Sequence, residues 1–222
     1  MRYIDKSRCC PEFEDLILRN RPTSWNNRRF AQSEVKLVLH RHILAEQQYL
    51  CVYCQQSIPD KTQKDDQLAT PPIRHPSHIE HIRPREIFPD LIFEHTNLAV
   101  SCEGFDIEMS ERNAPEFCGH PSKSRFNEAF HLHPFEKPDI EDFFEYNLKG
   151  EIKASAKDPE KAEYMIGLHQ LDHQKLTDMR QRQRLLIAQK IRQGLDIDTY
   201  LDPTQPELPK FFSMLRKLFG LA

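Results

Sequence analysis

Four of the six cysteines constrain the fold of this chain more than any other feature. Cys51 and Cys54 form a C-x-x-C pair, which places two thiolates on one tight turn, and Cys102 and Cys118 follow later in the chain. A structural zinc ion takes four such ligands in a tetrahedral arrangement. If these four cysteines bind one ion, the 15 residues between Cys102 and Cys118 must fold back to close the site. The alternative is four buried cysteines that bind nothing, and we favour zinc over it.

The composition is that of a soluble globular protein of one moderate domain, or of a small core with an appended part. The chain has 222 residues, of which 38% are hydrophobic and 29% charged. Its apolar runs are too short for a membrane span, and its charged start lacks the apolar region of a signal peptide. We therefore expect a cytoplasmic protein with no membrane partner, in which cysteines bind metal or stay free instead of forming disulfides.

The net charge of −3 gives no bulk attraction to nucleic acid, so a polyanion would have to bind through a local basic patch. Candidates for such a patch are Arg83, Arg85, Lys123 and Arg125, which lie near the most reactive part of the sequence. The alternative is that these side chains form a solvated face.

Hydrophobic periodicity predicts an α+β fold that is mostly helical. We expect helices over 32–48, 159–172, 174–193 and 206–219, strands over 77–82 and 97–102, a helix starting in 122–130, and a hairpin over 143–154. The expected organisation is an N-terminal helical segment (1–48), a zinc-stabilised core (49–135), a hairpin and helical extension (136–200) and a C-terminal amphipathic helix (201–222). The apolar stripe of that last helix either packs on its own core or docks into a partner.

A candidate catalytic set lies between the cysteines: Glu80, His81, Asn97 and His120. Hydrolysis of a phosphodiester requires an activated water and neutralisation of charge on the phosphate. One histidine acting as general base, with a divalent ion held by a carboxylate and a neutral nitrogen, supplies both. Asn97 can fix the orientation of an imidazole or of a metal ligand. We interpret the neighbouring His78 as structural or as a support for a metal ligand.

These motifs resemble those of a known family. The runs CVYC, HIEHIRPR, NLAVSC and CGHPSK are similar to the signature of HNH endonucleases in their zinc-stabilised form. The resemblance implies a ββα-metal core of two strands and a helix. It implies that Glu80 and His120 bind Mg²⁺ or Mn²⁺, that His81 is the general base, and that Asn97 holds His81 or assists the metal. Cys51, Cys54, Cys102 and Cys118 would bind the structural Zn²⁺.

A wider likeness suggests a biological setting. The stretches His133–Phe135 and Ile166–Leu171, followed by Leu176 and Arg180, resemble PtuB-type HNH proteins of Septu anti-phage systems. The resemblance implies a defence complex with a PtuA-like ABC-type ATPase, and in some systems a retron reverse transcriptase with its msDNA. DNA is the favoured target, and RNA such as tRNA is an alternative. A rival of another class is a zinc-stabilised binding or adaptor module without catalysis.

Overall fold

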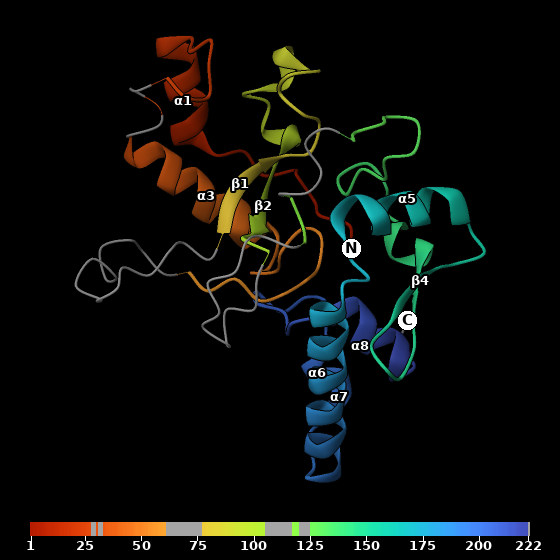
Figure 1. Ribbon diagram of the computed structural model, residues 1–222. Helices are drawn as coiled ribbons and strands as arrows, with labels where there is room; N and C mark the ends of the chain where they lie inside the picture. The colour runs from red at the N-terminus through yellow and green to blue at the C-terminus, as the bar shows by residue number, and fades with distance from the viewer. Residues whose placement is uncertain (28–29, 31–32, 61–76, 105–116, 120–124, 222) are drawn as a thin grey trace, which may run out of the picture.

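A computed structural model describes residues 1–27, 30, 33–60, 77–104, 117–119 and 125–221. The described residues form an α+β protein with two small antiparallel sheets among helices (Figure 1). The N-terminal helices are α1 (Pro11–Asn20) and α3 (Glu34–Glu46), which pack against each other. Proline in the first turn of α1 suits its fixed backbone angle, and acidic residues there favour the helix dipole.

The central sheet is an antiparallel pair, β1 (Ser77–His81) and β2 (Leu98–Cys102). Every residue of β2 is buried, and α3 packs against this strand. The connection between the strands contains two short 3-10 helices, η1 (Pro89–Leu91) and η2 (His95–Asn97). Both strands lie close to where their alternating and apolar patterns predict them, which places the residues of two candidate motifs side by side.

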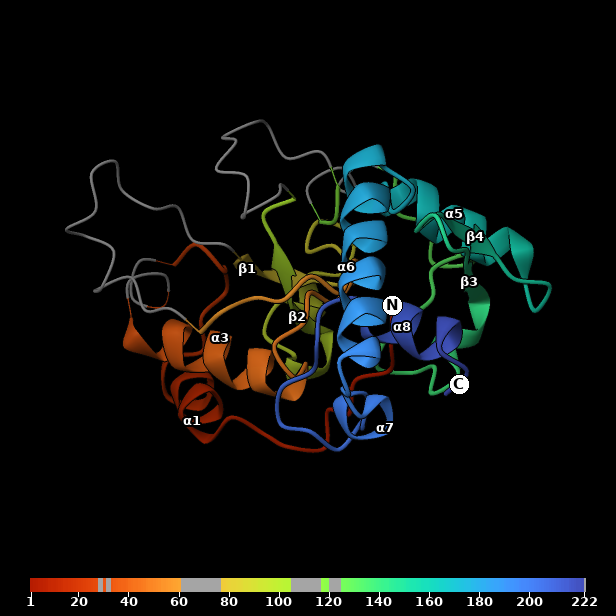
Figure 2. The same ribbon diagram turned by 90° about the horizontal axis from the view of Figure 1, so that it is seen from below.

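The second sheet is the predicted hairpin, formed by β3 (Phe144–Tyr146) and β4 (Ile152–Ala154) after the 3-10 helix η5 (Ile140–Phe143). Helix α5 (Pro159–His169) packs on β4, and α6 (Gln174–Arg192) follows it. Figure 2 shows the long α6 crossing the molecule beside α8. At the turn of the hairpin, Gly150 has a φ of +83°, and a Cβ there would lie 2.5 Å from the Thr177 carbonyl oxygen of α6. Glycine therefore allows the hairpin to touch the helix.

The C-terminal segment contains α7 (Ile197–Tyr200), which the sequence patterns did not predict, and α8 (Phe212–Leu218). The predicted helix over 206–219 is therefore too long, because its first residues, which include Pro206 and Pro209, lie outside α8. The apolar stripe is used internally, since four of its members are buried: Leu208, Phe211, Phe212 and Leu215. The sequence left open whether this stripe packs on its own core or docks into a partner. In the described structure it packs on the core of the same chain.

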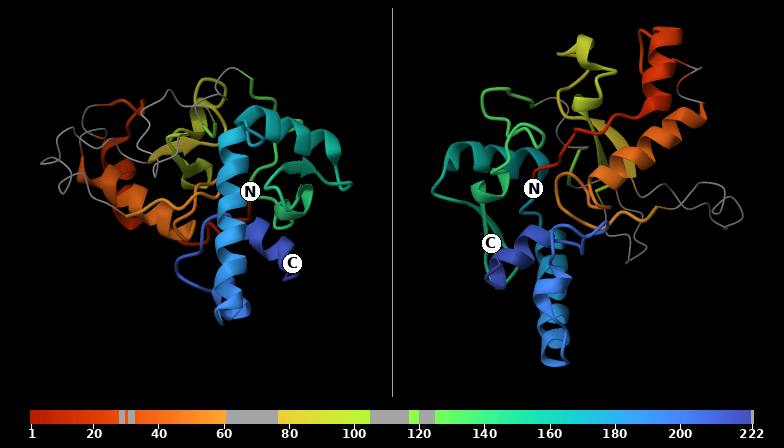
Figure 3. Two further views of the ribbon diagram at one scale, coloured as in Figure 1. Left: turned by 60° about the horizontal axis from the view of Figure 1, so that its bottom comes forward. Right: turned by 180° about the vertical axis from the view of Figure 1, so that it is seen from behind.

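One hydrophobic core joins the four expected segments, since its buried members run from Met1 to Leu215. The N-terminus lies inside the fold near α6 and α8, and Met1 is 1% exposed (Figure 3). The expected helix in 122–130 is wrong for the residues that can be compared, because 125–130 form an irregular segment and a turn. Among the described residues, no helix has the length and apolar character needed to cross a membrane.

Candidate metal centre and active site

The four cysteines of the predicted zinc site converge. Cys51, Cys54, Cys102 and Cys118 are buried, and their sulfur atoms all lie within 4.8 Å of one another. The Sγ–Sγ distances are 3.8 Å for Cys51–Cys118, 3.7 Å for Cys54–Cys102 and 3.4 Å for Cys102–Cys118. A tetrahedron with Zn–S bonds of about 2.3 Å has edges of about 3.8 Å. Four buried sulfurs at this spacing fit a metal ion such as zinc.

Local backbone structure positions the first two cysteines against β2. An isolated bridge between Leu50 and Ser57 closes the turn that carries Cys51 and Cys54. The Val52 N–H donates to the Val100 carbonyl at 3.1 Å, and the Cys102 N–H donates to the Cys51 sulfur at 3.3 Å. Backbone N–H donors to sulfur favour the thiolate form, which is the form that binds metal.

The electrostatics within the cluster also favour an ionised Cys51. Burial opposes its ionisation, but contacts from Cys102, Cys118 and Cys54 outweigh burial and hold the pKa of Cys51 well below its ordinary value. Burial raises the pKa of Cys118. A cluster of this kind is suited to a cation, because a metal ion removes the repulsion among several buried thiolates.

His81 is held in a defined tautomer at the end of β1. Its Nε2 lies 3.0 Å from the carbonyl oxygen of Ile92. A carbonyl only accepts hydrogen bonds, so Nε2 carries the proton and Nδ1 keeps its lone pair. The Trp25 ring meets the imidazole edge-on, with centroids 4.5 Å apart. Burial lowers the pKa of His81 to about 4, so the side chain is neutral at pH 7.

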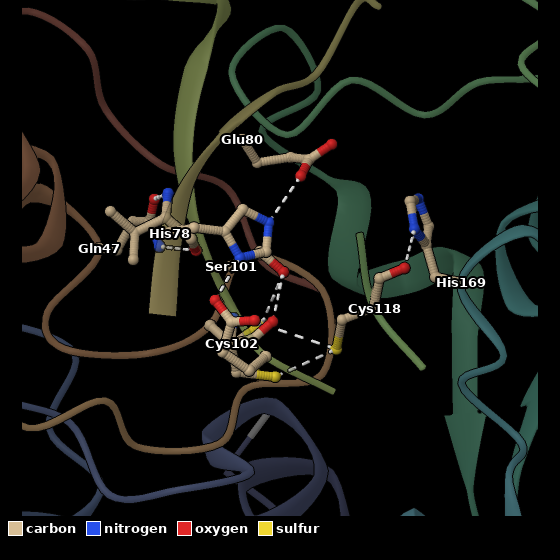
Figure 4. A network of polar contacts seen from close by, with 10 residues as sticks. Gln47, His78, Glu80, Ser101, Cys102, Cys118 and His169 are labelled. Atoms are coloured by element: carbon tan, nitrogen blue, oxygen red, sulfur yellow. Dashed lines mark hydrogen bonds and ion pairs between the residues drawn. The ribbon is translucent and has the colours of Figure 1, made fainter. Parts of the chain in front are cut away.

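Glu80 lies on the other face of β1 and takes part in a short ion-pair chain. His78 contacts Oε2 of Glu80 through Nε2 and Oε1 of Glu103 through Nδ1, both at 3.0 Å. Burial alone would lower the pKa of His78, but the two carboxylates outweigh it and raise that pKa to about 9. His78 therefore carries a positive charge beside Glu80 at neutral pH. Figure 4 shows the contact between the two side chains.

Gly119 allows the Glu80 carboxylate to approach the chain next to Cys118. A Cβ at Gly119 would lie 2.5 Å from Oε2 of Glu80, which is closer than real contacts allow. The carboxylate thus lies directly against the residue that precedes His120. His120 itself and Lys123 fall outside the described residues, so the predicted roles of these two side chains stay predictions.

The Asn97 side chain forms hydrogen bonds to the backbone of the loop that joins β1 and β2. Its Oδ1 accepts the Arg83 N–H at 2.8 Å, and its Nδ2 donates to the carbonyls of Arg83 at 3.1 Å and Leu91 at 3.2 Å. Both amide protons are used, and the side chain is 2% exposed. Because Leu91 precedes Ile92, whose carbonyl orients His81, this geometry links Asn97 to His81 through the loop instead of by direct contact.

The described arginines of the expected basic patch have different surroundings. Arg83 pairs with Glu128 at 2.8 Å and Glu136 at 2.9 Å, so its charge is compensated within the chain. Arg85 lines a cavity beside Glu80 and His81. Arg125 is exposed and its guanidinium lies 3.4 Å from the Leu168 carbonyl oxygen. Of these three described arginines, Arg85 is the one in the cavity lining.

The cavity that holds this chemistry has a volume of about 260 Å³. It is lined from both faces of β1, which brings Glu80 and His81 to one space although consecutive strand residues point to opposite faces. Sequence reasoning assigned no role to several further residues of its wall, among them Tyr53, His131 and His169. His169 is the last residue of α5. It lies in the stretch Ile166–Leu171 that carries part of the wider resemblance, but neither that resemblance nor helical periodicity assigned it a role.

A second group of potential ligands, His42, Glu46 and His95, lies between α3 and η2. The Lys6 ammonium contacts Glu46 at 2.7 Å and lies 3.5 Å from Nε2 of His95. Lys6 thus supplies the positive charge that a metal ion would supply. We regard this group as an ion-pair network that ties the N-terminal segment to the core.

A scan against models of known protein families found no match for this chain, and a search of curated proteins found no matching relative. The assignment of function therefore rests on the residues and their geometry.

Proposed function

We propose that this protein is a metal-dependent endonuclease that hydrolyses phosphodiester bonds through an HNH-type centre, with DNA as the favoured substrate. The observation that carries the proposal is the fixed neutral tautomer of His81 in a cavity shared with Glu80. A buried imidazole with a protonated Nε2 and a bare Nδ1 is prepared to accept a proton. A carboxylate in the same space is prepared to bind a hard divalent cation.

The chemistry of the proposed reaction can be assigned to the residues present. His81 accepts a proton at Nδ1 from the water that attacks the phosphorus, and the Ile92 carbonyl stabilises the imidazolium that forms. Arg85, in the wall of the same cavity, would add positive charge beside the bound phosphate. A Mg²⁺ or Mn²⁺ ion held by Glu80 and His120 would neutralise charge on the phosphate and on the leaving 3′ oxygen. The four cysteines hold Zn²⁺ and fix the frame in this proposal.

The core proposed here is of the ββα-metal type. The pair β1 and β2 supplies its two strands, with the expected base at the end of the first. The helix expected after the second strand, in 122–130, lies partly outside the described residues, and residues 125–130 are not helical. Support for the proposal comes from the strand pair, the cluster of four cysteines and the cavity.

The test is cleavage of plasmid DNA and of RNA by the zinc-loaded protein with added Mg²⁺ or Mn²⁺. We expect the wild-type protein to nick or cut DNA, and His81→Ala to retain its zinc and lose cleavage. Cleavage of RNA alone would move the substrate to RNA such as tRNA. Nucleic-acid binding with no cleavage by the wild type would instead indicate a non-catalytic zinc-stabilised module, and equal cleavage by His81→Ala would refute the assignment.

The proposed setting follows from the resemblance alone. We propose that the protein acts in an anti-phage complex with an ABC-type ATPase, in some cases together with a retron reverse transcriptase and its msDNA. Co-purification of the full-length protein with the ATPase encoded beside it tests this idea. A neighbouring gene of that kind whose product does not bind the protein would contradict it.

A further inference from the structure

We propose that His169 is a ligand of the divalent ion that Glu80 binds. The inference deepens the proposed function and rests on it. His169 ends α5, far from the strands in sequence, but its ring lines the same cavity as Glu80 and His81. Figure 4 shows the Glu80 carboxylate pointing toward the side on which the His169 ring lies.

The hydrogen bonds of His169 leave one ring nitrogen ready to bind a cation. Nδ1 lies 3.2 Å from the carbonyl oxygen of Cys118, so Nδ1 carries the proton and Nε2 keeps its lone pair. His169 is 1% exposed, and its Nε2 has no hydrogen-bond partner among the described residues. A buried acceptor without a partner destabilises the fold, and ligation of a metal ion would offset this cost.

Two residues of the cysteine cluster region, Tyr53 and Cys118, fix the position of the His169 ring. Tyr53, inside the C-x-x-C turn, stacks on the imidazole with centroids 3.7 Å apart and planes inclined by 22°. The Cys118 N–H donates to the His169 carbonyl oxygen at 2.8 Å, so the two residues bond to each other twice. A metal-bound histidine usually donates its other N–H to a carbonyl or carboxylate, and this fixes its tautomer and direction.

The segment that contains Cys118 and Gly119 contacts both the His169 ring and the Glu80 carboxylate. Cys118 holds His169, and the next residue, Gly119, accommodates Oε2 of Glu80. One carboxylate oxygen and one neutral imidazole nitrogen thus border one cavity. Imidazole ligands favour transition-metal ions, so the set suits Mn²⁺ better than Mg²⁺.

The test measures metal binding, with Mn²⁺ as the probe and the zinc-loaded full-length protein. Loss of the free Mn²⁺ signal in electron paramagnetic resonance gives the affinity, and electron spin echo modulation reports nitrogen bound to Mn²⁺. We expect His169→Gln to bind Mn²⁺ at least about tenfold more weakly with its zinc content unchanged. His133→Gln is the matched control, because His133 is also buried but lies outside the cavity wall, and it should bind as the wild type does.

A second variant keeps the inference testable if His169→Gln does not fold. In the double variant His78→Gln, His120→Gln, measured with enough Mn²⁺ to fill the site, the nitrogen modulation should persist, and bound Mn²⁺ without that modulation would overturn the inference. Wild-type affinity in His169→Gln would also overturn it.

The experiments distinguish a failure of the proposed His169 ligand from a failure of the proposed nuclease function. If Glu80→Gln abolishes Mn²⁺ binding while His169→Gln does not change it, only the role of His169 is wrong. If the wild type binds no Mn²⁺ and cuts no nucleic acid, the proposed function falls as well.

Discussion

Cys118 and His169 are joined by two hydrogen bonds across 51 residues of sequence. The N–H of Cys118 donates to the His169 carbonyl at 2.8 Å, and Nδ1 of His169 donates back to the Cys118 carbonyl at 3.2 Å. This pairing attaches the end of α5 to Cys118, the last of the four clustered cysteines. Any ion bound by the four cysteines would therefore also stabilise the wall of the cavity that contains Glu80 and His81.

The cysteine cluster predicts one zinc ion per chain, measurable by elemental analysis of the purified protein. Cys54→Ser should lose the ion and lower the melting temperature, because binding of a structural metal is part of the folding free energy. Cys9→Ser is the control, since Cys9 is an exposed thiol outside the cluster, and should change neither quantity. A zinc-free wild-type protein that is unaffected by chelators would contradict the zinc site.

Gly119→Ala tests the close approach of Glu80. The new Cβ would meet Oε2 at 2.5 Å, so we expect metal affinity and cleavage to fall by roughly tenfold or more. Gly167→Ala is the matched control, because a Cβ there meets nothing within 4 Å. Its position inside α5 favours alanine, which should stabilise the fold by about 0.5–1 kcal/mol. Unchanged metal affinity in Gly119→Ala would show that the carboxylate does not need this position.

Asn97→Ala tests the link between the loop and the base. It removes three part-buried hydrogen bonds to the backbone, so the free energy of unfolding should fall by about 3 kcal/mol. Cleavage should also decrease, because the loop holds the Ile92 carbonyl against His81. Asn20→Ala, at an exposed helix end, should leave both nearly unchanged. Denaturant unfolding and plasmid cleavage measure the two effects, and a stable, inactive Asn97→Ala protein would instead favour a direct catalytic role.

Sequence reasoning found the elements whose patterns are local. Both central strands, the hairpin and the long helices follow from alternation or helical periodicity, and the C-x-x-C spacing places two thiolates on one tight turn. The convergence of Cys118 with the other cysteines required a resemblance or a structure, because spacing alone does not show where a 15-residue loop returns.

Sequence periodicity does not predict which residues from distant segments line the cavity. His169 belongs to a helix whose apolar positions predict packing, and its importance appears only when Tyr53 and Cys118 are brought beside it. Arg83 was a candidate for phosphate contact, with a solvated face as the alternative. It pairs instead with Glu128 and Glu136, which lie 45 and 53 residues further along the chain. Long-range contacts of this kind leave no periodic signal in the sequence.

Acid should destabilise the protein through its buried neutral histidines, and His133 allows a separate test. Burial lowers the pKa of His133 to about 4, below the ordinary 6.5. As the pH falls, the unfolded chain therefore binds a proton at His133 before the folded protein does. The stability that depends on neutral His133 is fully present above about pH 6.5 and is lost as the pH falls toward about 4. His133→Gln should reduce the proton uptake on unfolding near pH 5 by up to about one proton, measured from the pH dependence of denaturant unfolding. An unchanged pH dependence would show that this histidine is already charged in the folded state.

The central claim is that His81 is the base of a phosphodiester hydrolase, and chemical rescue tests it most directly. His81→Ala removes the imidazole, and we expect DNA cleavage with Mn²⁺ to fall by about 10²–10⁴-fold while zinc content is retained. Added imidazole should then restore part of the cleavage in His81→Ala, and should restore none in Glu80→Gln. Cleavage by His81→Ala at the wild-type rate without imidazole would contradict the account.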